Sequence, residues 1–184
     1  MGQHFAQIAF TPAVQAEQAA LGSREHYARV AEQGRDDSLL SVQEAGFIHA
    51  RDSFYMATVS ATGWPYLQHR GGPPGFVRVL DAQQLGFADF TGNRQHVSIG
   101  NLATNDRVAL FFMDYANRRR LKLLGHARVV RDDPALLARL TPAGAERQAE
   151  SAMLIAVAGF EWNCPQHITP RFSAEEWAMA AGGR

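Results

Sequence analysis

Residues 85–115, LGFADFTGNRQHVSIGNLATNDRVALFFMDY, contain the pattern that decides the fold. A β-rich stretch, Leu85–Phe90, is followed by a polar turn and then by Asn93–Thr104, whose apolar residues recur at helical spacing. The apolar run Val108–Asp114 is typical of a buried strand. The stretch therefore predicts a short helix inserted between two strands.

Strand signals continue on both sides of this stretch. They lie in five further segments: Ser53–Ser60, Trp64–Arg70, Phe76–Leu80, Arg120–Arg131 and Ala152–Trp162. The turns Ala61–Gly63 and Asp81–Gln84 predict hairpins, because their residue types favour tight reversals of the chain. Several short strands joined by turns favour a barrel over alternating strands and helices. We therefore predict a mainly β (α+β) domain over residues 51–172.

Helical patterns predominate at the two ends of the chain. In residues 1–50 we expect an N-terminal helical arm that wraps around the barrel or a partner subunit. Its helices are predicted over Val14–Ala20, Ser23–Gln33 and Leu39–Phe47, the last ending near Gly46.

Two more helices have clear start signals. Pro134–Leu140 begins with proline after two aspartates, which favours a helix start. Ser173 and Glu176 form a capping-box pattern, which predicts a C-terminal helix over residues 173–184.

Composition excludes several classes of protein. Lys and Arg number 18 and Asp and Glu number 18, so the basic excess typical of nucleic-acid binders is missing. One cysteine, Cys164, precludes an intrachain disulfide and gives no zinc-ligand spacing, so we expect no metal. The N-terminus has no signal-peptide pattern, and no apolar run approaches the ~20 residues that span a bilayer. We expect a cytoplasmic protein without membrane contact.

Two segments have residue types that suit a phosphorylated ligand. In Tyr66–Gly75, a strand ending in Gln68, His69 and Arg70 runs into Gly71, and glycines let a backbone approach a ligand closely. In the second segment, a helix N-terminus would gather polar and basic side chains around an anion. The side chains are those of Asn93, Arg94, Gln95 and Ser98. The alternatives are a plain surface loop for the first segment and an ordinary helix cap for the second.

Two later segments are less specific. Asn117–Lys122 has four basic residues, and strand alternation favours Arg120 as the one facing a ligand. Basic residues also commonly protect an exposed edge strand. Glu161–Ile168 contains Cys164 and His167, for which a structural or cofactor-edge role is favoured over thiol catalysis.

In this order, three blocks resemble the pyridoxamine 5′-phosphate oxidase-like family, the FMN-binding split-barrel flavoproteins. The blocks are FYMATVSATGWPYLQHRGG, LGFADFTGNRQHVSIGNLATNDRVALFFMDY and RRRLKLLGHARVV, and the resemblance covers about residues 45–170. It implies a six-stranded antiparallel split β-barrel with peripheral helices. It also implies a homodimer with FMN at the subunit interface.

The resemblance also implies roles for particular residues. Residues at the start of the helix would hold the FMN phosphate, and the strand before the glycines would lie along the flavin. Arg120 would contact flavin from the other subunit, and Gln166 or His167 would close the site. These positions are Gln68, His69, Arg70, Gly71, Asn93, Arg94, Gln95, Ser98, Arg120 and Gln166.

The chain departs from the vitamin B6 oxidase itself. Gln95 stands where that enzyme usually has a second basic residue, and its C-terminal Arg-His motif is not recognisable in NCPQHITPRF. We therefore expect an FMN oxidoreductase acting on another small molecule, with a nicotinamide as one possible electron donor. No catalytic residue is assigned, although His69 is the best candidate for a general acid. The alternatives are a non-catalytic flavin-binding module and a barrel that binds haem or a deazaflavin.

Overall fold

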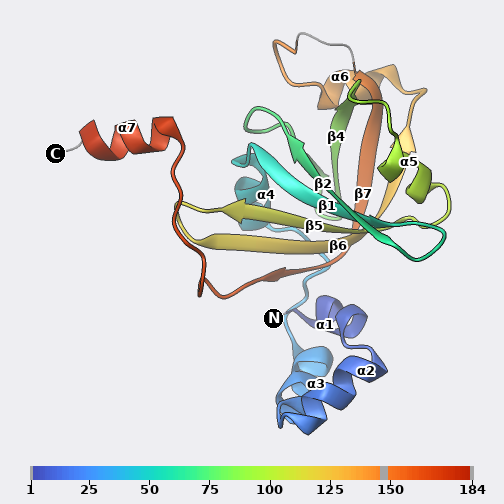
Figure 1. The fold of residues 1–184 in the computed structure, drawn as a ribbon, viewed down its shortest axis with the longest axis vertical. Coiled ribbons are helices and arrows are strands. Elements are labelled where there is room, and N and C mark those ends of the chain that lie inside the picture. The colour runs from blue at the N-terminus through green and yellow to red at the C-terminus, as the bar shows by residue number, and fades with distance from the viewer. Residues whose placement is uncertain (1, 146–148, 183–184) are drawn as a thin grey trace.

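A computed structural model describes residues 2–145 and 149–182 and contains one antiparallel sheet (Figure 1). Within the described residues the sheet has seven strands in the order β2-β1-β5-β6-β7-β4-β3. The mainly β split-barrel class is therefore confirmed, with one strand more than the six expected. The strands are β1 (Ser53–Val59), β2 (Pro65–Gly71), β3 (Arg78–Asp81), β4 (Gln84–Phe90), β5 (Arg107–Asp114), β6 (Arg119–Val130) and β7 (Ala149–Trp162).

Alternating side chains fix which face of each strand is buried. In β5, residues Val108, Leu110 and Phe112 are buried inside the barrel, while the residues between them face outward. The ring of Phe54 on β1 stacks against Phe112 at 5.0 Å and meets Phe87 of β4 edge-on at 5.4 Å. Each fully buried aromatic ring contributes about 1.5–3 kcal/mol of transfer free energy. This apolar core holds the sheet in its curled form.

The curled sheet brings β2, at one end of the strand order, next to β4 near the other end. Arg70 of β2 forms an ion pair with Asp89 of β4, and Gln68 bonds to Ser98 of helix α5 (Val97–Leu102). The register pairs β2 only with β1, and β4 with β3 and β7. Side chains therefore close the barrel where β2 faces β4 and α5. We call this line the seam.

Two predicted helices have different bounds in the structure. Helix α5 begins at Val97, not at Asn93, because Arg94 and His96 adopt left-handed backbone angles that a right-handed helix cannot contain. Helix α4 (Val42–His49) begins later than expected, where Ser41 and Glu44 form a capping box, and it continues past Gly46 to His49.

The other two predicted helix starts agree with the structure. In α6 (Pro134–Leu140), the Asp133 carboxylate accepts a hydrogen bond from the Leu136 amide at 2.9 Å. Before α7 (Ala174–Gly182), Ser173 and Glu176 exchange the two bonds of a capping box, at 2.8 and 3.1 Å. The capping residues in the sequence were therefore sufficient to locate the starts of α6 and α7.

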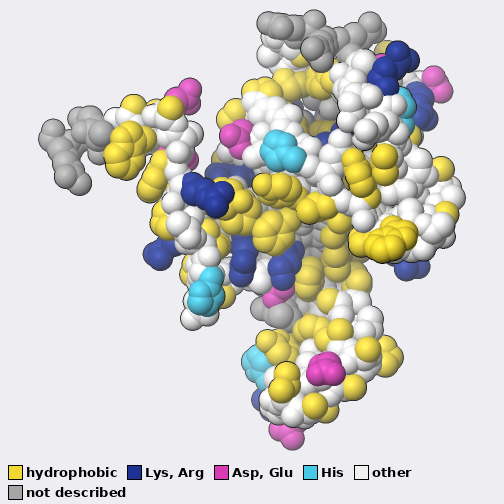
Figure 2. Space-filling view, viewed as in Figure 1, with side chains coloured by type: hydrophobic (Ala, Val, Ile, Leu, Met, Phe, Trp, Pro, Cys, Tyr) yellow, Lys and Arg dark blue, Asp and Glu magenta, His cyan; other side chains and the backbone are white. Residues whose placement is uncertain are grey.

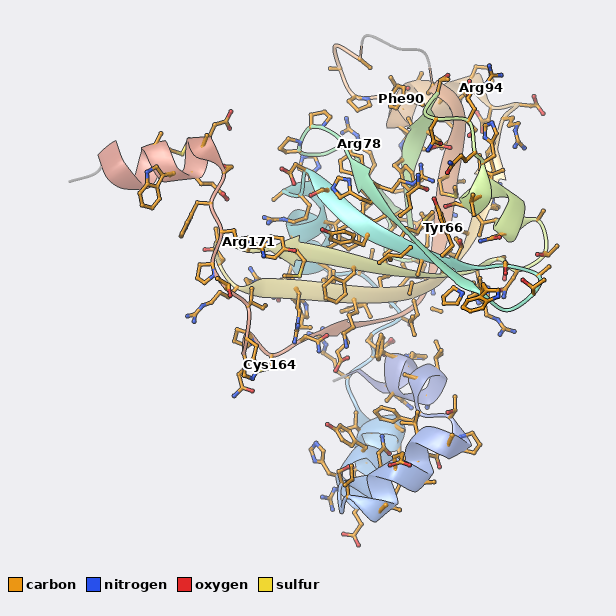
Figure 3. The ribbon with its side chains drawn as sticks, viewed as in Figure 1. Tyr66, Arg78, Phe90, Arg94, Cys164 and Arg171 are labelled. Atoms are coloured by element: carbon orange, nitrogen blue, oxygen red, sulfur yellow. The ribbon has the colours of Figure 1, made fainter. Side chains whose placement is uncertain are left out.

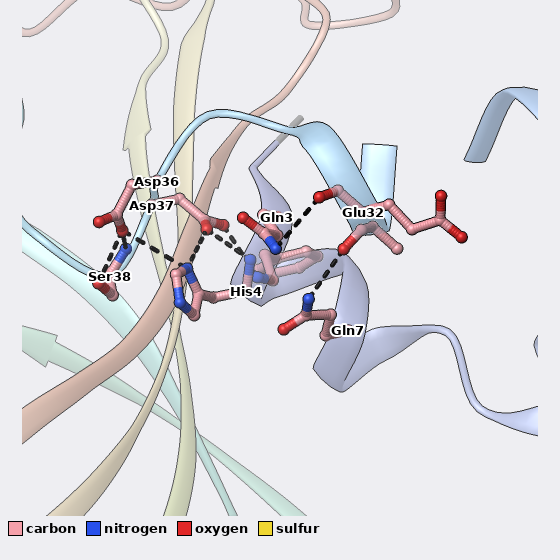
Figure 4. Close-up of polar contacts among 9 residues, drawn as sticks. Gln3, His4, Gln7, Glu32, Asp36, Asp37 and Ser38 are labelled. Carbon is pink, nitrogen blue, oxygen red and sulfur yellow. Dashed lines mark hydrogen bonds and ion pairs between the residues drawn. The ribbon is translucent and has the colours of Figure 1, made fainter. Parts of the chain in front are cut away.

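The N-terminal helices form a small lobe beside the barrel and do not wrap around it (Figure 1). The lobe consists of α1 (Gln3–Ala9), α2 (Pro12–Ala20) and α3 (Arg24–Gln33). The buried carboxylate of Asp37 accepts bonds from the amides of His4 and Phe5 at 2.7 and 2.9 Å (Figure 4). A Cβ at Gly159 of β7 would lie 2.7 Å from the Phe5 nitrogen, so glycine permits α1 to approach the sheet closely.

Among residues 2–145 and 149–182, no helix is both long enough and apolar enough to cross a membrane.

Candidate functional site at the seam of the barrel

Two adjoining hollows lie along the seam. The first, of about 60 Å³, is bounded by β2, the end of β4, residues 91–96 and α5. The second, of about 230 Å³, continues along β2 to the glycine-rich loop and Phe87. All the predicted site residues except Arg120 and Gln166 line one or both hollows. The predicted residues of two separate segments, 68–71 and 93–98, therefore meet in one place.

Arg70 and Asp89 form the firmest contact across the seam. The guanidinium Nη1 lies 2.6 Å from the Asp89 Oδ1, and both side chains are largely buried. The same guanidinium lies over the Phe87 ring, 5.6 Å from its centroid. Its Nε is buried and makes no hydrogen bond with the described residues. Arg70 is thus fixed in place, with one buried donor left unsatisfied by the described residues.

A second contact ties β2 to α5. The Ser98 hydroxyl donates to the Gln68 side-chain oxygen at 3.0 Å, and Ser98 is buried. One turn later, the Asn101 amide donates to Thr58 of β1 at 2.9 Å, with both side chains buried. These two bonds position α5 across the end of the barrel. Ser98 and Gln68 therefore serve first to hold the walls of the hollow.

The turn before α5 contributes Arg94, a cation without an ion-pair partner among the described residues. Arg94 is exposed on the wall of the smaller hollow and forms no ion pair with any described residue (Figure 3). The Asn93 side-chain oxygen accepts a bond from the Gln95 amide at 3.2 Å, which stabilises the turn. The left-handed φ of 59° at Arg94 is uncommon for a residue with a side chain. The turn thus presents a permanently charged donor pair to the hollow.

Two carboxylates also line the smaller hollow, and sequence reasoning missed both. Asp89 is neutralised by Arg70, whereas Glu150 of β7 accepts a bond from the Thr91 hydroxyl at 2.5 Å. Glu150 is exposed and adds negative charge at the rim. A charged Asp89 within the apolar strand LGFADF was the available signal, since an acid there needs a partner.

The predicted residues of β2 divide between two faces of the strand. Gln68 and Arg70 point across the seam, whereas the His69 ring packs edge-on against Tyr55 at 5.6 Å. A Cβ at Gly72 would lie 2.7 Å from the Phe76 ring, so this glycine is required by the chain's own folding. Packing within the chain therefore accounts for part of the glycine content of this loop, and no ligand is needed to explain it.

Arg120 and Gln166 line neither seam hollow. Arg120 lies on β6, which is separated from β2 by β1 and β5 in the sheet. Gln166 lies between Cys164 and Arg171, which Figure 3 shows on the side of the barrel away from Arg94. Within one chain, these two residues do not meet the others.

The segment that carries Gln166 contacts the barrel through Tyr115. The Arg171 guanidinium lies over the Tyr115 ring, 5.2 Å from its centroid. Burial raises the pKa of the Tyr115 hydroxyl above its usual value, and the neighbouring Tyr55 adds to the rise. This contact directs the C-terminal segment along the ends of β5 and β6.

Residues 41–168 match the model of a family described as pyridoxamine 5′-phosphate oxidase. No curated protein is similar to the chain at the level of sequence.

Solved structures share the fold at low sequence identity. HupZ from Group A Streptococcus is 16% identical, with a TM-score of 0.55, over 72% of this chain and 100% of its own. A candidate pyridoxamine 5′-phosphate oxidase from Lactobacillus delbrueckii is 21% identical, with a TM-score of 0.52, over 67% and 94%. General stress protein 26 from Bacillus anthracis is 16% identical, with a TM-score of 0.50, over 70% and 92%. At these identities the likeness concerns the fold alone.

Proposed function

Because the chain belongs to the pyridoxamine 5′-phosphate oxidase family, we propose that it binds FMN at the seam and works as an FMN-dependent oxidoreductase. The observation that carries the proposal is the pair of adjoining hollows lined by Gln68, Arg70 and Arg94. These side chains come from segments far apart in the sequence and leave a cation beside an open space.

The donors at the smaller hollow fit a phosphate monoester. Arg94 offers a charged pair of donors, and the side chains of Asn93 and Gln95 add neutral ones. The six-residue α5 begins after this turn, so the proposed phosphate contact depends on Arg94 rather than on a helix end. Glu150 opposes a second negative group at the rim, which favours a mononucleotide over a dinucleotide.

The larger hollow has the mixed walls that a flavin ring requires. Phe76 and Phe87 provide apolar surface, and the buried Nε of Arg70 is a donor without a partner among the described residues. The ion pair with Asp89 fixes the orientation of the Arg70 guanidinium, and with it the direction of this donor. Once bound, FMN would supply hydride and electron transfer, and a nearby cation such as Arg70 would stabilise its reduced form.

We further propose that the working protein is a homodimer with the cofactor at the subunit interface. Arg120 and Gln166 are implied by the family resemblance, yet both lie away from the seam of their own chain. A second copy related by twofold symmetry would bring them to this seam, as in isologous dimers. The single cysteine fits a reducing compartment, and we propose the cytoplasm.

An optical spectrum of the purified protein tests the cofactor. We expect flavin absorbance bands. These bands should be bleached when a reduced nicotinamide, or the protein's own substrate, is added. A spectrum typical of haem or of a deazaflavin would replace FMN with that cofactor. Retained FMN that no donor reduces would indicate a flavin-binding module without turnover. Colourless protein that takes up no added FMN would refute the proposal.

Arg94→Ala tests the phosphate contact directly. Loss of a charge-assisted donor pair should weaken FMN binding about tenfold or more. Arg131→Ala is the matched control, because Arg131 is exposed and lines neither seam hollow. Equal FMN affinities for the two variants would disprove the role of Arg94.

A further inference from the structure

Three side chains of metal-ligating types meet where the N-terminal lobe joins the barrel. The Nδ1 atom of His4 lies 3.1 Å from Asp37 Oδ1 and 3.5 Å from Asp36 Oδ1 (Figure 4). Among residues 2–145 and 149–182, this is the one group of three His, Cys, Asp or Glu side chains whose ligand atoms lie within 4.8 Å of one another. Helix α1 supplies the histidine, and the segment after α3 supplies both aspartates.

The separations within this group match those between ligands of a small divalent ion. Zinc binds imidazole nitrogen and carboxylate oxygen at roughly 2.0–2.2 Å. Two such ligands lie roughly 3.4 Å apart at a tetrahedral angle and roughly 3.0 Å apart at a right angle. The observed 3.1 and 3.5 Å are close to these values, so an ion would bind with only small movements of the three side chains.

Hydrogen bonds alone leave the negative charge of the group poorly balanced. His4 presents one ring nitrogen to both aspartates, and Asp36 at 3.5 Å lies beyond a good hydrogen bond. Asp37 is 1% exposed and accepts the amides of His4 and Phe5, but it forms no ion pair with a described Lys or Arg. Figure 2 shows the Lys and Arg side chains of the visible face mainly over the barrel, with few on the lobe. Because a buried carboxylate usually has a cationic partner, a bound cation would fill that role.

The group is open to solvent on one side and ordered on the other. The side chains of His4 and Asp36 are 39% and 58% exposed, so an ion can enter and retain a water molecule beside three protein ligands. The Asp36 Oδ1 accepts bonds from the amide and the hydroxyl of Ser38, at 2.9 and 2.7 Å. Such bonds to a ligating carboxylate fix its orientation in metal sites.

We propose that His4, Asp36 and Asp37 bind a divalent transition-metal ion of the Zn²⁺ type, and that this ion fastens the N-terminal lobe to the barrel. Imidazole with carboxylates suits zinc, cobalt or nickel, whereas calcium and magnesium prefer oxygen ligands alone. The ion would join α1 to Asp37, whose carbonyl accepts a bond from the Phe160 amide of β7 at 3.0 Å.

The proposed metal site is separate from the seam. All three ligands precede residues 41–168, the part of the chain that matches the family model. The absence of a metal was expected from the single cysteine, and that criterion does not detect ligands that only the folded chain brings together. The site therefore depends neither on FMN nor on a second copy.

Equilibrium dialysis of the full-length protein tests the site. After treatment with a chelator, the protein is dialysed against micromolar ZnCl₂, and bound zinc is measured by atomic absorption. We expect one zinc ion per chain, bound about tenfold or more weakly by His4→Ala, which keeps the backbone amide that donates to Asp37. His126→Ala is the matched control, because His126 lies 3.0 Å from Asp106 without a third such ligand among the described residues. Equal zinc binding by these two variants would overturn the proposal.

Hydrogen exchange tests whether the ion fastens the lobe. Saturating Zn²⁺ should slow exchange of the His4 and Phe5 amides about tenfold or more, since both donate to Asp37 and exchange only when α1 separates from it. Asp36→Asn, which keeps an oxygen for Ser38, should abolish this effect of zinc. Bound zinc that leaves both exchange rates unchanged would refute the fastening role, whatever the seam binds.

Discussion

The barrel is closed differently on its two sides. Strands β5, β6 and β7 are joined by backbone pairing along most of their length, whereas β2 meets β4 and α5 through side chains. Backbone pairing tolerates many side chains, but the seam depends on the identities of a few polar ones. The two sides therefore separate stability from binding, because the two seam hollows occur where the backbone ladder is interrupted.

The largest effect should follow from a change in the apolar core that supports the paired side. Phe112→Ala on β5 removes a fully buried ring that stacks on Phe54 at 5.0 Å. The free energy of unfolding should fall by about 3–5 kcal/mol, because the remaining cavity is only partly refilled. Urea denaturation followed by tryptophan fluorescence measures this. A loss below about 1 kcal/mol would show that the paired side does not govern stability.

A polar contact on the paired side, which consists of β5, β6 and β7, should have the second-largest effect on the free energy of unfolding. The Trp162 indole of β7 donates to Glu44 at 2.7 Å, and Glu44 is also bonded to Ser41 at the start of α4. Glu44→Gln should lower the free energy of unfolding by about 2 kcal/mol, since it leaves buried donors poorly matched. Gln43→Ala, an exposed neighbour in the same helix, is the control and should have little effect.

The same carboxylate predicts a pH dependence. Burial tends to raise the pKa of Glu44, but hydrogen bonds from Ser41 and Trp162 outweigh it and hold the pKa below its usual value. The ionised Glu44 carboxylate therefore stabilises the fold fully at pH values well above the ordinary glutamate pKa of about 4.3. This stabilisation is lost as the pH falls through the lower pKa that Glu44 has in the folded chain. Glu44→Gln should therefore flatten the acid limb of the stability curve. An unchanged acid limb would contradict this assignment.

At the seam, Asp89→Asn should have a smaller effect on stability and a larger one on binding. The free energy of unfolding should fall by about 1–2 kcal/mol, because Arg70 keeps a hydrogen-bond partner but loses its counter-charge. FMN affinity should fall several-fold because Arg70 is less firmly oriented. Calorimetric titration measures the affinity. If Asp89→Asn lowered the free energy of unfolding as much as Phe112→Ala does, the seam would contribute to stability as strongly as the paired side, which would contradict this comparison.

Gln68→Ala should have the smallest effect. It removes one partly buried hydrogen bond, with Ser98, and should cost about 0.5–1.5 kcal/mol. Gln83→Ala, in the exposed β3–β4 turn, should be neutral. Equal unfolding midpoints for the two variants would show that the contact between β2 and α5 contributes nothing to closing the barrel.

The features that the sequence predicted correctly are those that depend on short-range patterns of residues. The alternation of buried and outward residues located the strands, and capping residues located the starts of α6 and α7. Helix α1 was missed because its support comes from Asp37, which is more than thirty residues away in the chain. The start of α5 was misplaced because Asn93 resembles an N-cap while Arg94 and His96 adopt left-handed angles.

The candidate site was predictable only in part for the same reason. Glycine, arginine and amide residues marked Gln68, Arg70 and Arg94 as candidates, and these line the seam. Asp89 and Glu150 could not be placed there, since their proximity follows from the curl of the whole sheet. In the proposed dimer, Arg120 and Gln166 would reach the site from a second copy, about which local patterns contain no information.

Strand β2 has one further consequence, which concerns handling of the protein. Within the described chain, its edge facing the seam has no backbone partner, and an unpaired strand edge can recruit another chain. A bound ligand and an intact Arg70–Asp89 ion pair would both shield that edge. Preparations stripped of ligand should therefore precipitate more readily on storage, by edge-to-edge addition of strands, than preparations that retain it.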